Sequence, residues 1–169
     1  IFNIMLALFR VYTYTVHKMS RTKGHNMELS IVLNVILIVV CIHLYRQLRL
    51  DSFTELLNKA QFNQDVQQLK RKNDTVVIID IDKFKTINDT MGHEYGDETI
   101  KLVYKVIKAS IRSTDRAYRI GGDEFGIICS CASIGDRIQA ELQRYDIDVS
   151  VGSGNSYQSA DKAMYVNKV

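Results

Sequence analysis

Two short stretches of this 169-residue chain place carboxylates where they suit a metal-bound polyphosphate. In the first, the apolar run Val76 to Ile79 leads directly into Asp80-Ile81-Asp82. A buried carboxylate is costly without a partner, and α/β proteins bind ligands beyond the carboxyl ends of their strands. We therefore interpret Asp80 as a metal ligand. For Asp82 we favour the structural interpretation, in which it caps the turn that follows the strand.

The second stretch is Gly121-Gly122-Asp123-Glu124-Phe125. The two glycines predict a hairpin turn in which both residues accept positive φ. Glycines let a triphosphate approach the main chain, while carboxylates hold Mg²⁺ against its oxygens. By itself a Gly-Gly-Asp hairpin indicates only a turn. Together with Asp80 it predicts a hard-oxygen metal site that can activate a hydroxyl and neutralise a polyphosphate.

A third stretch, residues 84–97, reads FKTINDTMGHEYGD. Its density of Asn, Asp, Lys and Gly is typical of a loop with a functional role. The structural alternative is a capped helix–turn–helix.

The elements around these stretches predict an α/β sandwich with a mixed central sheet and flanking helices. Phe62, Val66 and Leu69 recur on one helical face, and Thr75 to Ile81 is a β-branched run typical of a buried strand. The remaining expected elements are a helix at 96–111, strands at 115–120 and 124–131, a helix at 134–145, a strand at 147–151 and a helix at 159–168.

Charge gives no argument for nucleic acid as a partner, and none is expected. The net charge is only +3, and no basic run exceeds Lys70-Arg71-Lys72, which we interpret as a solvated helix end.

Residues 27–45 predict a transmembrane helix. Leu29 to Tyr45 contains no Lys, Arg, Asp or Glu, and it would span about 26 Å as a helix. A buried core helix is the alternative, and a cleaved signal peptide is disfavoured because no small-residue cleavage site follows. Residues 46–50 then form a short linker.

The N-terminal segment, residues 1–26, stays uncertain. Ile1 to Phe9 resembles the end of an earlier membrane span. The basic residues that follow would place their loop in the cytoplasm, where a nucleotide-binding domain also belongs. These two demands conflict for a single span, so the number of spans is left open.

From Asp51 to the end, the chain resembles the GGDEF family of diguanylate cyclases. The motifs that carry the resemblance, in order, are Asp51-x-x-Thr54-x-x-x-Asn58, Asp80-Ile81-Asp82-x-Phe84-Lys85-x-Ile87-Asn88-Asp89, Gly92-His93-x-x-Gly96-Asp97, the signature Gly121 to Phe125, Ser150-Val151-Gly152 and Ala160 to Tyr165. The resemblance implies a nucleotide-cyclase, palm-like sandwich over residues 51–169. The segment between Phe125 and Ala160 is shorter than is usual in the family, so the domain is abridged towards its C-terminal end.

The resemblance also implies the reaction, in which two GTP molecules condense into cyclic di-GMP with Mg²⁺ or Mn²⁺. Asp80, Glu124, Asp123 and the Ile81 carbonyl would hold the metal. Asp123 and Glu124 would be the catalytic residues, with Asp123 able to take the proton from the attacking 3′-hydroxyl.

Asn88 and Asp97 would read guanine, whose donor and acceptor pattern differs from that of adenine. The other implied GTP contacts are Phe84, Lys85, Gly121, Gly122 and Lys168. Arg112 and Asp115 resemble the family's inhibitory product-binding motif.

The implied partners and location follow from this reaction. Each domain holds one GTP, so a homodimer is expected, in the inner membrane with its catalytic domain in the cytoplasm. The alternative function is a catalytically weak or silent module that binds GTP or cyclic di-GMP and signals to a partner.

Overall fold

The computed structural model of the chain describes residues 10, 13–14, 25–69 and 74–168. It divides into two compact units, Ile1–Leu48 and Arg49–Val169. The expected end of an earlier span at Ile1 to Phe9 and the Lys70-Arg71-Lys72 triplet lie outside the described residues.

Helix α2 (His25–Arg49) belongs mainly to the first unit. Within the described residues, the 19 residues Ile31–Arg49 are long and apolar enough to cross a membrane. Ile31, Val35 and Val39 are each more than half exposed, at 57%, 54% and 59%. A core helix of a soluble protein would bury such side chains. The helix continues through residues 46–49, where a linker was expected.

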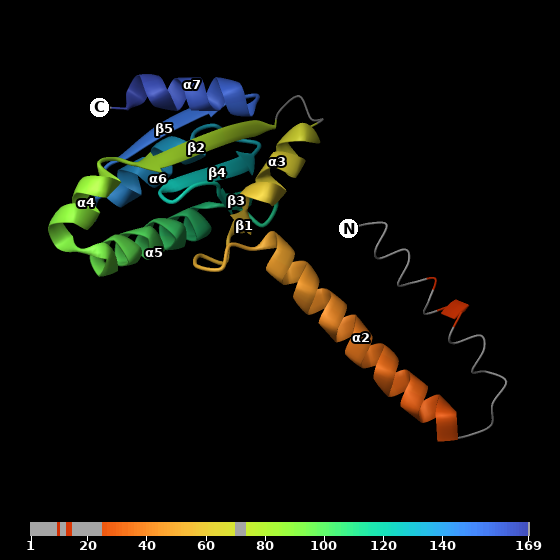
Figure 1. Ribbon diagram of the computed structural model, residues 1–169. Helices are drawn as coiled ribbons and strands as arrows, with labels where there is room; N and C mark the ends of the chain where they lie inside the picture. The colour runs from red at the N-terminus through yellow and green to blue at the C-terminus, as the bar shows by residue number, and fades with distance from the viewer. Residues whose placement is uncertain (1–9, 11–12, 15–24, 70–73, 169) are drawn as a thin grey trace. The chain divides into compact units, whose positions relative to one another are not determined.

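The second unit is built on a mixed sheet, as predicted, and this sheet has five strands where four were expected (Figure 1). The spatial order is β1-β3-β4-β2-β5, in which β1 and β3 are parallel and the other neighbours antiparallel. The strands are β1 (Leu57–Asn58), β2 (Thr75–Ile81), β3 (Arg116–Arg119), β4 (Glu124–Cys129) and β5 (Val149–Gly154).

Helices cover both faces of this sheet, and Figure 1 shows α7 and α5 on opposite sides. The helices are α3 (Lys59–Gln67), α4 (Phe84–Met91), α5 (His93–Ser110), α6 (Ile134–Gln143) and α7 (Tyr157–Asn167). Val77 and Ile79 of β2 join the apolar cluster that includes side chains of α5 and α6, whereas Val76 and Ile78 join the cluster that includes α3 and α7. Because side chains alternate along a strand, Asp80 faces the side covered by α3 and α7.

Helix α7 packs very close to β5 because residue 152 is a glycine. A Cβ at Gly152 would lie 2.6 Å from the Cα of Met164, and it would also meet the backbone nitrogen of Met164 and the carbonyl oxygen of Ala160. The missing side chain therefore sets how close the C-terminal helix comes to the sheet.

Most expected elements are present, with shifted ends. Strand β2 has the predicted bounds. Residues 84–97 form α4, a turn at Gly92 (φ 87°) and the start of α5, so the helix–turn–helix of the structural alternative is correct, although neither helix has a side-chain cap. The two-residue strand β1 was missed because it is too short to show a periodic pattern.

Candidate active site

Asp80 and Glu124 lie opposite each other on neighbouring strands. They are register partners in the antiparallel pairing of β2 with β4, so both side chains project to the same face of the sheet. Asp80 is only 4% exposed, although its side chain is a carboxylic acid. The long-range pairing thus brings together two carboxylates that are far apart in the sequence.

Lys168, just beyond α7, supplies a positive charge to this pair. Its Nζ lies 2.7 Å from Oδ1 of Asp80. No other donor among the described residues reaches that oxygen. The contact with Asp80 raises the pKa of Lys168 despite partial burial, and the charges of Asp123 and Asp82 act in the same direction. Among the described residues, the buried Oδ1 of Asp80 is therefore compensated only by its ion pair with the Lys168 ammonium.

Glu124 is destabilised in its charged form. Burial raises the pKa of its carboxyl group, the charges of Asp80 and Asp123 raise it further, and Lys59 partly offsets them. A cation bound between these carboxylates would relieve both the burial and the repulsion.

The described part of the chain contains no group of three or more His, Cys, Asp or Glu side chains that could by itself hold a metal ion. Mg²⁺ commonly takes one or two carboxylates and completes its shell with water and substrate phosphates. Asp80 and Glu124 fit that kind of site, in which a nucleotide supplies the remaining ligands.

The signature turn between β3 and β4 is held by main-chain hydrogen bonds. The amides of Ile120 and Gly121 donate to the carbonyl of Glu124 at 2.9 and 3.2 Å, and the amide of Ile81 donates to the carbonyl of Asp123 at 3.2 Å. The prediction of positive φ at both glycines is wrong, since among the described glycines only Gly92 has it. Four residues, Ile120 to Asp123, separate β3 from β4, so this connection does not need the mirror-image geometry of a two-residue hairpin.

The two signature glycines have different surroundings. A Cβ at Gly121 would lie 2.6 Å from Oε2 of Glu124, whereas a Cβ at Gly122 would meet nothing within 4 Å. Gly121 thus leaves room for the Glu124 carboxylate, whereas the space beside the Cα of Gly122 is free of other protein atoms.

Arg119 braces this turn, and sequence reasoning missed it. Its Nη2 and Nε donate to the carbonyl of Gly122 at 2.7 and 3.2 Å, and its Nη1 lies 3.3 Å from Oδ1 of Asp51. The guanidinium also lies over the ring of Phe53, 5.1 Å from its centroid. The position of Arg119 two residues before Gly121 could have indicated a role at this turn. Its partner Asp51, however, is distant in the sequence, so the contact could not be predicted.

Asp51 is itself held firmly. Its Oδ1 accepts hydrogen bonds from the amide and the hydroxyl of Thr54, both at 2.8 Å. Burial raises the pKa of Asp51, but the Thr54 hydrogen bonds and the Arg119 charge outweigh it and hold the pKa below its ordinary value. The turn at the start of the second unit is therefore tied to the signature turn.

Asp82 does not cap the turn that follows β2, contrary to the prediction. Its Oδ1 accepts a hydrogen bond of 2.6 Å from the Ser150 hydroxyl on β5. Helix α4 instead starts after Lys83, which has a left-handed conformation (φ 53°) and no side-chain cap. A non-glycine residue in this region is strained, and such strain clusters at functional sites.

The two expected guanine readers lie on facing helices. The side-chain oxygen of Asn88 on α4 occupies the space that a Cβ at Gly96 on α5 would take, and Gly96 directly precedes Asp97. Phe84 packs partly against the apolar core, while Lys85 is exposed. Phe84, which is expected to contact GTP, therefore also contributes to the packing of the core.

Arg112 and Asp115 form one compact turn between α5 and β3. The Arg112 amide donates to Oδ2 of Asp115 at 2.9 Å, and the Asp115 amide donates to the Arg112 carbonyl at 3.0 Å. A small cavity of about 30 Å³ beside this turn is also lined by Arg137 of α6. Arg137 was not singled out from the sequence, because α6 lies close to this turn only in the fold.

The GGDEF diguanylate cyclase domain model matches residues 48–168. The chain belongs to this family. Among GGDEF proteins it is similar to the diguanylate cyclase DgcS of Shewanella oneidensis, with 30% identity over 148 residues that cover 72% of this chain and 50% of DgcS. It is also similar to the probable diguanylate cyclase DgcT of Escherichia coli, with 30% identity over 206 residues, 99% of this chain and 44% of DgcT.

Solved GGDEF structures share the fold. The GGDEF domain of TpbB (YfiN) from Pseudomonas aeruginosa has 28% identity and a TM-score of 0.62, covering 70% of this chain and 87% of that one. The coiled coil and GGDEF domain of DgcB from Caulobacter crescentus, solved in complex with c-di-GMP, has 24% identity and a TM-score of 0.74, covering 83% and 91%.

This GGDEF chain spans half the length of DgcS and less than half that of DgcT. The alignment with DgcT runs over 206 residues, which is more than the 169 of this chain. DgcT therefore has insertions relative to the matched region.

Proposed function

We propose that this chain condenses two molecules of GTP into cyclic di-GMP with the help of Mg²⁺ or Mn²⁺. The observation that supports this most strongly is the register pairing of Asp80 with Glu124, next to a signature turn in which a Cβ at Gly122 would meet nothing within 4 Å. Family membership and the names of the relatives support the same reaction.

Asp80, Glu124, Asp123 and the Ile81 carbonyl would hold the metal. When bound, the ion would neutralise the triphosphate and acidify the attacking 3′-hydroxyl. Asp123 would accept the proton from that hydroxyl, and Glu124 would be the second catalytic carboxylate, next to Asp123 in the chain. The raised pKa of Glu124 is consistent with a carboxylate arranged to face a cation.

The remaining site residues would bind and orient GTP. Asn88 and Asp97 would pair with the guanine edge, next to Phe84. Lys85, Lys168 and the backbone of Gly121 and Gly122 would contact the triphosphate. Lys168 already lies against Asp80 and so beside the expected position of the phosphates.

The assembly that we propose is a homodimer, because each chain has one set of these residues and the product contains two nucleotides. Residues 27–45 would anchor it in the inner membrane, with the domain from residue 51 onward in the cytoplasm. The turn of Arg112 and Asp115, with Arg137 beside it, would bind cyclic di-GMP as an inhibitor.

The test is product formation by the full chain in detergent micelles with GTP and MgCl₂ or MnCl₂, followed by liquid chromatography. We expect cyclic di-GMP from the wild type. Asp80→Asn should lower the rate on the order of a hundredfold or more, because it removes charge stabilisation worth several kcal/mol. Glu98→Gln, which removes an exposed ion pair with Lys101 on α5, serves as the matched control and should keep the wild-type rate.

A second candidate is a silent GTP-binding or cyclic di-GMP-binding module. The contact of Lys168 with Asp80 favours it, because the ammonium competes with a metal for the same oxygen. Wild-type protein that binds GTP but forms no product with either metal would establish this alternative and contradict the cyclase.

A further inference from the structure

A buried carboxylate outside the candidate active site, Asp65 of α3, connects this helix to strand β3. Asp65 is 8% exposed. Its Oδ2 accepts a hydrogen bond of 2.7 Å from the Tyr118 hydroxyl and lies 2.9 Å from Nη1 of Arg116. Its Oδ1 accepts a hydrogen bond of 2.7 Å from Nε2 of Gln61. Three donors, one of them charged, thus compensate the burial of this carboxylate.

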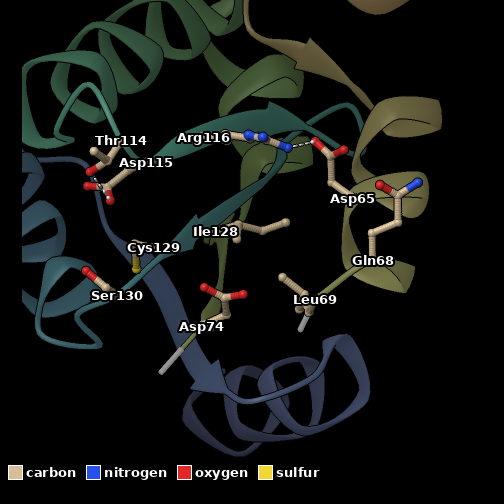
Figure 2. A pocket seen from close by; sticks show the side chains of 10 residues that line it. All are labelled: Asp65, Gln68, Leu69, Asp74, Thr114, Asp115, Arg116, Ile128, Cys129 and Ser130. Carbon is tan, nitrogen blue, oxygen red and sulfur yellow. Dashed lines mark hydrogen bonds and ion pairs between the residues drawn. The ribbon is translucent and has the colours of Figure 1, made fainter. Parts of the chain in front are cut away.

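The contacts of Asp65 reach towards two other parts of the unit. On one side, Oε1 of Gln61 accepts a hydrogen bond of 2.7 Å from Nε of Arg49, the last residue of α2 and the first of the second unit. On the other side, Arg116 directly follows Asp115 of the proposed product-binding turn. Figure 2 shows the Arg116–Asp65 pair along one side of a pocket of about 280 Å³, which Asp115 also lines.

Packing makes this network rigid. The ring of Tyr118 is fully buried and packs edge-on against Phe62 of α3, with 5.1 Å between centroids. Burial and the neighbouring Asp65 carboxylate raise the pKa of Tyr118, so the phenol remains a donor at neutral pH. Arg116 and Tyr118 are two residues apart on β3, so their side chains lie on the same face of the strand. Asp65 therefore contacts β3 at two positions on that face.

We propose that Asp65 is a positioning residue that fixes the start of β3 and, with it, the Arg112–Asp115 turn. The affinity of this turn for cyclic di-GMP then depends on the hydrogen bonds of Asp65. It also depends on the contact between Arg49 and Gln61, which joins the same network. The product-binding part rests on the proposed function. A turn held in place before binding loses less conformational entropy when the ligand docks. Linkage is reciprocal, so bound product would in turn stabilise the Arg49–Gln61 contact.

The first test measures the affinity of the full chain in detergent micelles for cyclic di-GMP by calorimetry. Asp65→Asn and Tyr118→Phe should weaken binding roughly threefold to thirtyfold, while the KM for GTP stays unchanged. Tyr118 is buried and cannot touch the ligand, so its effect must be indirect. Glu98→Gln should bind like the wild type. Wild-type affinity in both network variants would overturn the proposal.

The second test examines the link to Arg49 with a double-mutant cycle. Arg49→Gln alone should weaken cyclic di-GMP binding in the same direction. In the Asp65→Asn background it should have no further effect, because the connection is already broken. Fully additive losses would contradict the link.

Hydrogen exchange separates failure of this proposal from failure of product binding. Without nucleotide, the amides of Arg116 to Arg119 should exchange faster in both network variants, relative to those of β5. Equal acceleration in β5 would indicate general destabilisation and contradict a local role. If the wild type binds no cyclic di-GMP, or if Arg112→Ala binds it normally, the product-binding role fails and the exchange data alone decide whether Asp65 fixes β3.

Discussion

At the scale of single residues, Glu124 is confined by its neighbours. Its carboxylate lies across strands from Asp80, beside Asp123, and against the bare Cα of Gly121. Each neighbour limits where the carboxylate can point. The position of the Glu124 carboxylate thus depends on the missing side chain of Gly121 as much as on charge.

Gly121→Ala tests this confinement. The new Cβ would lie 2.6 Å from Oε2 of Glu124, so the flexible end of that side chain must move while the fold is kept. We expect product formation to fall roughly a hundredfold, the scale of a 1 Å misplacement at a reacting centre, with little change in melting temperature. Product formation at the wild-type rate in Gly121→Ala would argue against displacement of Glu124.

Cys131 offers a separate check on local electrostatics. A hydrogen bond with Ser133, helped by the charges of Arg112 and Arg137, lowers the pKa of its thiol, whereas burial raises the pKa of Cys129. Below pH 9 a lowered pKa means more thiolate. Cys131 should therefore react with iodoacetamide well before Cys129 at pH 7.5, and Ser133→Ala should slow it. Peptide mapping by mass spectrometry measures both rates, and equal rates at the two thiols would contradict this.

At the scale of elements, the position of α7 follows from its contact with β5. Gly152 lets the backbone of α7 lie against the sheet, and Lys168 follows just after this helix and reaches Asp80. Packing of one helix therefore positions a charge at the candidate active site.

Gly152→Ala should destabilise the domain, because the added methyl group meets main-chain atoms of Met164 that cannot move independently of α7. We expect a loss of about 1–3 kcal/mol in the free energy of unfolding, the usual cost of overpacking. Urea denaturation followed by circular dichroism measures it. The exposed Gly122→Ala variant is the control, and equal stability of the two variants would show that α7 has room to shift.

At the scale of the whole molecule, the proposed reaction needs two chains. An excess of Asp80→Asn chains added to a fixed amount of wild type should lower cyclic di-GMP formation, because mixed dimers carry one defective site. The same excess of Glu98→Gln chains should not lower it. Product analysis after subunit exchange in detergent measures the rate of both mixtures. If the excess of Asp80→Asn chains leaves the wild-type rate unchanged, this would contradict catalysis across a dimer.

The sequence by itself determined the family, the bounds of β2 and the mixed character of the sheet. These follow from local signals, namely a β-branched run, glycine turns and motif spacing, which depend on residues that are neighbours in the chain. The signals were weaker for residues 84–97, where polar residues suggested a loop and two amphipathic helices formed instead.

Only the tertiary structure decided which distant residues meet. The pairing of Asp82 with Ser150, the grip of Arg119 on the signature turn and the burial of Asp65 under Tyr118 all join separate elements. Such contacts depend on strand order and helix placement, which satisfy the whole core at once. For the same reason, the sequence could identify Asp80 and Glu124 as chemically suitable, whereas the pairing of β2 with β4 placed them side by side.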